Sequence, residues 1–171
     1  ALNPDHLSLY GLTYEEGTPF HRWRQEGTVT PVLDDTYVDM YKMAQMLFHN
    51  AGYEHYEISN WCKPGKESRH NLLYWRRNNY LGFGVAAHGM FASCRYAFIE
   101  DRVKYYKIFC GGDWNANTLF PHPDLLADRE ECSHDILASD AMIFGLRLME
   151  GISRKHLNQQ LGYRPEEHWD A

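Results

Sequence analysis

The pattern of apolar and polar positions predicts a strand, a helix and a second strand in the first third of the chain. Residues 6–12 and residues 53–58 are short apolar runs typical of buried strands. Between them, apolar side chains recur at helical spacing from about residue 36 to residue 50, and Asp34 or Asp35 stands where a side chain would cap the helix. This order predicts a βαβ unit with parallel strands and a right-handed crossover.

Glycine and proline interrupt the chain between the first strand and the helix of this unit, and again after it. They predict a loop over residues 13–31. A third apolar run follows at residues 80–87, where Gly82 and Gly84 interrupt the strand pattern. A glycine inside a strand often marks the close approach of a ligand or of another backbone segment. We therefore expect one of these two neighbours beside the run.

The later part of the chain is predicted to be mostly helical. Residues 90–99 read as a further strand or a hairpin arm, and residues 113–123 as a loop. The helical patterns are, in chain order, residues 102–109, residues 125–149 ended by Gly151, and residues 153–162 capped by Ser153. The pattern changes near residue 100 from mixed strands and helices to mostly helices, which predicts two domains, residues 1–100 and residues 101–171.

Composition narrows the function classes. The chain has 171 residues and a net charge of −6, with no basic run, so nucleic acid is not the expected partner. No segment approaches the roughly 18 apolar residues of a membrane span. There is no signal-peptide pattern, and we expect a cytoplasmic protein with reduced thiols. The absence of a start methionine suggests a fragment or a processed chain.

The four cysteines lack the spacing of a local metal motif. They stand at positions 62, 94, 110 and 132, with no C-x-x-C pair. This spacing argues against a zinc ribbon and against an iron–sulfur motif within the chain. Signatures of dinucleotide binding, of serine hydrolases and of zinc proteases are also missing from the sequence.

The richest chemistry lies in residues 69–75, Arg-His-Asn-Leu-Leu-Tyr-Trp. His70 can ligate iron or move protons, Asn71 can orient a ligand, and Tyr74 and Trp75 can stack on a flat aromatic molecule. An equally weighted alternative is structural: His70 and Asn71 cap a helix that begins at Leu72, and the two aromatic rings pack beneath it. His88, after the glycine-broken run, is a further candidate for a site's rim.

Several ordered motifs together resemble a known family. They are HLSLYGL from His6 with EGTPF from Glu16, GYEHYEISN from Gly52, HNLLYW from His70, YLGFGVAAH from Tyr80, and Gly145-Leu-Arg with Glu150-Gly151. This set is similar to the radical SAM proteins related to oxygen-independent coproporphyrinogen III oxidase. The His-Asn-x-x-Tyr-Trp element is similar to their HemW branch, a group of haem chaperones. One departure is Ala-Ala-His-Gly around His88, where the family usually has Gly-Ala-His-Ser.

The resemblance implies an α/β fold: the second half of a partial (β/α) radical SAM barrel, followed by the start of a mostly helical C-terminal domain. The family holds a [4Fe–4S] cluster and S-adenosylmethionine through residues that would lie upstream, so no metal ligand is expected in this chain and we expect it to be inactive alone. The resemblance places candidate haem or substrate contacts at His70, Asn71, Tyr74, Trp75 and His88. It places a cofactor-side rim at Tyr10, Gly82 and Gly84.

The resemblance implies two possible functions for the longer protein, and a purely structural role of residues 69–75 is the third alternative. The first is a haem chaperone that binds haem or a porphyrin and delivers it to haem-accepting proteins, with peripheral membrane association and dimer formation as further expectations. The second is a porphyrinogen oxidase that decarboxylates propionates through a 5′-deoxyadenosyl radical. The third makes residues 69–75 a structural cap that closes the barrel. Half a barrel exposes a sheet edge, so we expect the isolated chain to self-associate.

Overall fold

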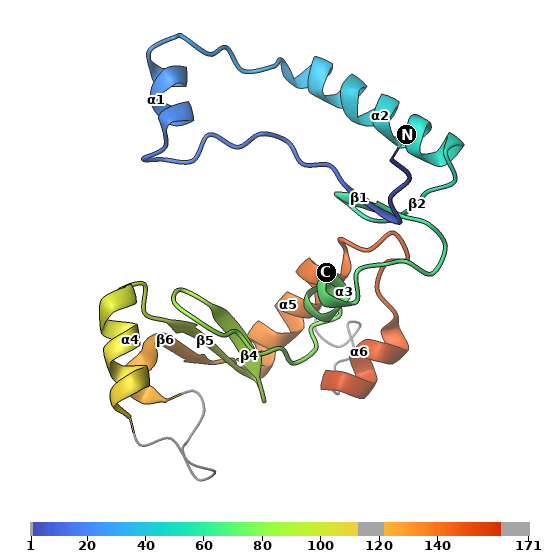
Figure 1. Cartoon of the computed structure of the whole chain (residues 1–171). Coiled ribbons are helices and arrows are strands. Elements are labelled where there is room, and N and C mark those ends of the chain that lie inside the picture. The colour runs from blue at the N-terminus through green and yellow to red at the C-terminus, as the bar shows by residue number, and fades with distance from the viewer. Residues whose placement is uncertain (1, 113–121, 162–171) are drawn as a thin grey trace. The chain divides into compact units, whose positions relative to one another are not determined.

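The computed structural model describes residues 2–112 and 122–161, and the chain divides into two compact units, residues 1–68 and residues 69–171 (Figure 1). Each unit contains one three-stranded sheet together with helices, so the fold is mixed α and β. The domain boundary expected near residue 100 stays a prediction. No described helix is long and apolar enough to cross a membrane.

The sheet of the first unit corrects the predicted βαβ arrangement. Strands β1 (His6–Ser8) and β2 (Glu54–Glu57) run in the same direction, but β3 (Asn60–Cys62) lies between them and is antiparallel to both. The physical reason is local. The chain turns back directly after β2, so β3 pairs with its sequence neighbour and takes the place where a parallel partner was expected.

The helices of the first unit are α1 (Pro19–Gln25) and α2 (Asp34–Asn50). Helix α1 interrupts the stretch predicted as loop: the Thr18 hydroxyl accepts a hydrogen bond from the His21 amide at 3.2 Å, and Pro19 occupies the first turn. Helix α2 confirms the periodic pattern. Its capping position is nevertheless Leu33, while both aspartates lie in the first turn, where negative charge favours the helix dipole.

The core of the first unit is centred on β3. Trp61 is 1% exposed and pairs with Leu7 on one side and His55 on the other. The His55 ring stacks on the Trp61 indole at 4.3 Å, and Phe48 of α2 meets the indole edge-on at 5.2 Å. The buried indole therefore contributes apolar contact that holds α2 to the sheet.

The second unit contains the sheet β4–β5–β6, all antiparallel. Residues 90–99, predicted as a further strand or as one arm of a hairpin, instead turn back at Ala92 and Ser93, so that β4 (His88–Phe91) and β5 (Cys94–Phe98) form both arms. The connecting residues Ala92 and Ser93 have φ of 48° and 64°. Both values are left-handed, as a two-residue turn that matches the twist of the strands requires.

Two expected elements of the second unit differ from their predictions within the described residues. Residues 80–87 form no strand: Tyr80 makes an isolated β-bridge with Met90, and beyond it Gly84 and Ala86 take φ of 99° and 56°, which end an extended run. The long helix predicted over residues 125–149 is also wrong in its first part. Residues Leu126–Glu131 form β6, preceded by the 3-10 turn η1 (Pro123–Leu125), because that segment has no apolar helical stripe.

The helices of the second unit are α3 (Arg69–Trp75), α4 (Arg102–Gly111), α5 (His134–Gly145) and α6 (Arg154–Leu161). Helix α4 agrees with its prediction, and Asp101 caps it by accepting from two backbone amides. Helix α6 begins after Ser153 as expected, whereas its expected stop at Gly162 and most of the loop expected at residues 113–123 lie outside the described residues. Because β6 joins the sheet, the described part of residues 101–171 is less helical than predicted.

Apolar packing fixes the sheet of the second unit to its helices. One buried cluster contains Met90, Cys132 and Leu137, which joins β4 to α5. The other is built around Tyr96, Phe98 and Leu125, with Tyr105 of α4 packed against it. In Figure 1 α4 lies alongside β5 and β6, and Phe98 meets Tyr105 edge-on at 5.8 Å.

Candidate functional site

Helix α3 carries four of the candidate site residues. It begins at Arg69, so His70 and Asn71 lie in its first turn and do not cap a helix that begins at Leu72. His70 is exposed, and its Nε2 lies 2.9 Å from the hydroxyl of Tyr74, four residues later and on the same face of the helix. The imidazole is thus oriented by a neighbour and open to solvent, as a ligand-binding histidine needs to be.

The aromatic side chains of α3 connect it to the hairpin. The Tyr74 ring meets the Tyr80 ring edge-on at 4.5 Å, and Tyr80 pairs through its backbone with Met90 of β4. Burial, followed by the nearby Tyr74, raises the pKa of Tyr80, so this hydroxyl stays protonated at neutral pH. Tyr74 therefore has an exposed polar end on His70 and a packed ring on Tyr80.

Gly82 and His88 lie against each other through their backbones. A Cβ atom at Gly82 would overlap the His88 carbonyl oxygen and lie 2.6 Å from the carbonyl carbon. The Gly82 amide also donates to the hydroxyl of Tyr96 at 3.1 Å. The sequence predicted either a ligand or another backbone segment beside this glycine, and the structure shows the backbone of His88 there. Gly84 faces open space at φ 99°, and the His88 side chain is exposed at the start of β4.

Tyr10 belongs to the first unit, unlike the other candidate residues. Its hydroxyl accepts a hydrogen bond from the Asn60 amide nitrogen at 3.4 Å, and Asn60 also donates to the Glu57 carboxylate. Asn60 and Glu57 are 1% and 0% exposed. Glu57 accepts a further bond from the Ser59 amide at 3.1 Å. This buried polar group holds the β2–β3 turn and gives Tyr10, itself exposed, a fixed hydroxyl position.

A pocket of about 570 Å³ lies beside Trp75, between the end of α3, the end of α5 and the start of α6. Its charged lining residues are Arg76, Arg77, Glu150 and Lys155. Arg76 pairs with Glu150 at 3.0 Å across 74 positions of sequence. Gly145 permits the close approach of the loop after α5, because a Cβ there would lie 2.7 Å from the Ile152 side chain.

Trp75 has an unusual polar environment in this pocket. The Arg147 guanidinium lies 4.3 Å from the centre of its ring, a cation–π contact. Its indole N–H is buried and has no hydrogen-bond acceptor among the described residues. Sequence reasoning placed Trp75 at the site but missed the charged residues around it. The signal was present, since Arg147 and Glu150 belong to motifs that carried the family resemblance.

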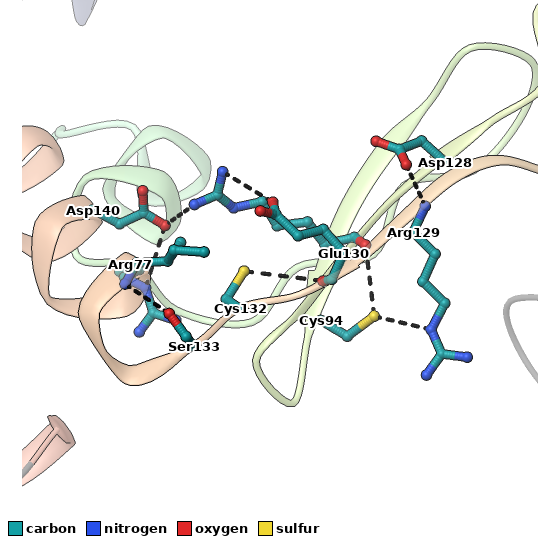
Figure 2. Close-up of polar contacts among 10 residues, drawn as sticks. Arg77, Cys94, Asp128, Arg129, Glu130, Cys132, Ser133 and Asp140 are labelled. Carbon is teal, nitrogen blue, oxygen red and sulfur yellow. Dashed lines mark hydrogen bonds and ion pairs between the residues drawn. The ribbon is translucent and has the colours of Figure 1, made fainter.

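An ion network with a buried centre adjoins the pocket. Asp140 of α5 pairs with Arg77 at 3.9 Å and also accepts from Arg95 of β5, which in turn reaches Glu130 at 3.6 Å (Figure 2). The side chains of Arg77 and Asp140 are only 8% and 10% exposed. Burial lowers the pKa of Arg77, and the Asp140 carboxylate opposes this effect. The network joins α5, the sheet and Arg77, which lies two residues after the end of α3.

Comparison with known proteins shows which proteins the chain is similar to. No family model matches the chain. It is 32% identical over 153 residues to the haem chaperone HemW of Synechocystis, which covers 90% of this chain and 35% of that protein. It is 30% identical over 161 residues to a mitochondrial radical S-adenosyl methionine domain-containing protein of Danio rerio, which covers 89% of this chain and 34% of that protein. The chain is related to the HemW-type radical SAM proteins.

A solved structure supports the fold of this HemW relative. Coproporphyrinogen III oxidase (HemN) from Escherichia coli, a radical SAM enzyme, superposes with a TM-score of 0.64 at 16% identity, over 94% of this chain and 37% of that one. At that identity the likeness concerns the fold alone. The chain spans about a third of the length of the curated relatives described above.

Proposed function

We propose that this chain is the part of a HemW-type haem chaperone that contacts haem, and that α3 provides the contact. The observation that carries the proposal is the exposed His70 imidazole, held by the Tyr74 hydroxyl at 2.9 Å on the helix that also carries Trp75. An imidazole is a common axial ligand of haem iron, and tyrosine and tryptophan rings suit a flat macrocycle. The name of the Synechocystis relative supports haem as the cargo.

The hydrogen bond to Tyr74 determines how His70 could bind iron. Only an unprotonated ring nitrogen can be a ligand, and Nε2 is occupied by the Tyr74 hydroxyl. Iron therefore either binds Nδ1 or displaces the hydroxyl from Nε2. In the second case, removal of the hydroxyl makes Nε2 available without competition. His88, exposed on β4, is a second candidate contact, and Asn71 is a candidate for orienting the ligand.

The family cofactors belong to the longer protein in this proposal. A [4Fe–4S] cluster with S-adenosylmethionine supplies a 5′-deoxyadenosyl radical when bound. Among the described residues, no group of three or more histidine, cysteine or acidic side chains comes together, and the described structure has all four thiols free. These residues do not fit the cluster, so its ligands would lie outside this chain, with Tyr10, Gly82 and Gly84 on the rim that faces it.

The same proposal covers the architecture and the partners. Residues 1–100 would complete the second half of a partial barrel in the longer protein, and residues 101–171 would begin its C-terminal domain. Delivery to haem-accepting proteins in the cytoplasm would follow binding. A porphyrinogen oxidase is the alternative, and no residue contact in this chain favours it. Turnover of coproporphyrinogen III by the longer protein would contradict a role restricted to chaperoning.

Replacement of His70 by alanine should weaken haem binding about tenfold or more, because an axial ligand is lost. Tyr74→Phe should bind at least as tightly as the unaltered chain, because it frees Nε2 and keeps the ring on Tyr80. The measurement is a haem titration followed by the position and amplitude of the Soret band. His49→Ala, at an exposed position in the last turn of α2, is the control. An unchanged Soret band and affinity in His70→Ala would rule out this ligand.

A further inference from the structure

Cys94 lies beside an arginine side chain. It is the first residue of β5, and the Nε–H group of Arg129 on β6 donates a hydrogen bond to its sulfur at 3.3 Å (Figure 2). This hydrogen bond is the largest cause of the raised pKa of Arg129. As a thiol, Cys94 also donates to the Arg95 carbonyl oxygen at 3.5 Å. The thiolate is the nucleophilic form of cysteine, and a neighbouring cation favours it. Cys94 therefore has the surroundings of a nucleophile.

The other three cysteines provide references within the same chain. Cys62 and Cys132 are buried, at 0% and 9% exposed. Cys110 is exposed near the end of α4, where its thiol interacts with the Tyr106 hydroxyl, a neutral group. Cys94 is half-buried. Exposure alone would make Cys110 the most easily modified thiol, so faster modification of Cys94 would have to come from its surroundings.

Glu131 opposes the effect of Arg129 on this thiol. It lies opposite Cys94 in the strand register, and its carboxylate accepts a hydrogen bond from the Arg129 guanidinium at 2.9 Å. The Arg129 and Glu131 side chains are 54% and 79% exposed, so water screens both charges. The thiol thus lies between a cation that it contacts directly and a carboxylate that shares this cation. Each charge should change its reactivity a few-fold, in opposite directions.

A cavity of about 530 Å³ adjoins the same thiol, apart from the pocket beside Trp75. Its wall includes the apolar side chains of Phe91, Pro123 and Leu126, and Cys94 and Arg129 both line it. The volume is within the usual range of small-molecule sites. A small molecule in this cavity would meet the sulfur, the guanidinium and an apolar wall together.

We propose that Cys94 is a site of covalent modification, at which a small organic hydroperoxide bound in this cavity oxidises the thiol to sulfenic acid. The thiolate sulfur attacks the terminal oxygen of the hydroperoxide. An S–O bond forms as the O–O bond breaks, and the departing alkoxide takes a proton from solvent to become an alcohol. The sulfur is oxidised and the hydroperoxide is reduced, so the step needs no further reactant.

The lining of the cavity fits this chemistry. The Arg129 guanidinium is a planar group with several N–H donors, so it can stabilise the thiolate and also donate to the oxygen that leaves. The apolar wall around Phe91 and Leu126 suits the organic group of the hydroperoxide. The site is independent of α3 and of haem, so it goes beyond the proposed function and does not rest on it.

The decisive measurement compares Cys94 with Cys110 in the unaltered 171-residue chain. The chain is exposed briefly to cumene hydroperoxide, sulfenic acids are trapped with dimedone, and each cysteine is quantified by peptide mass spectrometry. Cys94 should be labelled about fivefold faster than the more exposed Cys110. With hydrogen peroxide, which has no organic group, this ratio should fall about twofold or more. Equal labelling of the two cysteines would overturn the proposal, and an unchanged ratio with hydrogen peroxide would overturn the role of the cavity.

Arg129→Met tests the cation and keeps most of its aliphatic chain. It should slow the labelling of Cys94 about threefold, because the thiolate loses its charged neighbour. The matched control is Arg22→Met, which also removes an exposed arginine paired with a glutamate, Glu26 at 3.9 Å, and should leave Cys94 unchanged. An Arg129→Met protein whose Cys94 is labelled as fast as in the unaltered chain contradicts the proposal.

Glu131→Gln provides a test in which the expected change is a gain. It removes the carboxylate that shares Arg129, so Cys94 should be labelled about twofold faster. Glu130→Gln removes a neighbouring carboxylate that pairs with Arg95 instead, and should have no effect on Cys94. Cys132 reports on folding in every variant, because it is buried beside the same sheet and should stay slowly labelled. Slower or unchanged labelling of Cys94 in Glu131→Gln would overturn the electrostatic explanation.

Discussion

Replacement of Gly82 by alanine should destabilise the second unit by about 3 kcal/mol or more. The new methyl group would overlap the His88 carbonyl oxygen and lie 3.1 Å from the His88 nitrogen. These are backbone atoms of a residue paired with Ala97 in the sheet, so they cannot rotate away as a side chain would. Relief would have to move the strand, and it would also break the bond from the Gly82 amide to Tyr96.

Urea unfolding followed by far-ultraviolet circular dichroism measures this loss. Gly111→Ala is the matched control, because the same methyl group there meets no atom within 4 Å and Gly111 has no left-handed φ. It should be neutral or slightly stabilising at the end of α4. If Gly82→Ala instead unfolds at the same urea concentration as Gly111→Ala, the backbone contact is not as the structure describes it. Gly82 would then return as a candidate for ligand approach.

Replacement of Asp140 by leucine should lower the free energy of unfolding by about 3–5 kcal/mol, because it leaves Arg77 buried without its counter-charge. Arg77 has little access to water, and burial already lowers its pKa. Arg95 loses the same partner but is 39% exposed and retains Glu130. The cost therefore arises mainly at Arg77, on the segment that leads from α3 into the hairpin.

A double variant separates charge burial from simple loss of packing. Asp140→Leu combined with Arg77→Met removes both buried charges and should recover most of the lost stability, since two apolar side chains need no compensation. Glu130→Gln removes an exposed carboxylate of the same network and should change stability by less than about 0.5 kcal/mol. A double variant as unstable as Asp140→Leu alone would show that the network is not held together by the Arg77–Asp140 pair.

Much of the fold was predictable wherever one short segment carries its own signal. Helix α2 follows from seventeen residues with a helical apolar period, and α4 from Asp101, whose side chain caps its first turn. Residues 90–99 were predicted as a further strand or one hairpin arm, and the turn within them was missed, since a short apolar run does not by itself show where it turns back. The family relationship also came from local motifs, and the comparisons confirm it.

The errors in the predicted elements each have a physical reason. Residues 126–131 were included in a helix because the apolar helical pattern after residue 136 was extended back to residue 125, yet pairing with β5 satisfies their backbone and makes them a strand. Residues 80–87 read as strand, but Gly84 and Ala86 adopt left-handed φ, and Tyr80 alone among them forms a β-bridge, with Met90. Helix α1 was not predicted, because its start depends on the Thr18 cap and Pro19 within a stretch that is rich in turn residues.

The sequence by itself determined the contact between His70 and Tyr74, because residues four positions apart lie on the same face of a helix. Only the tertiary structure decided what surrounds them. Arg76 meets Glu150, and Arg77 meets Asp140, across more than sixty positions. Such pairs form when α5 and the loop before α6 fold back against α3, and no local propensity encodes that approach. The pocket beside Trp75 is a product of that packing.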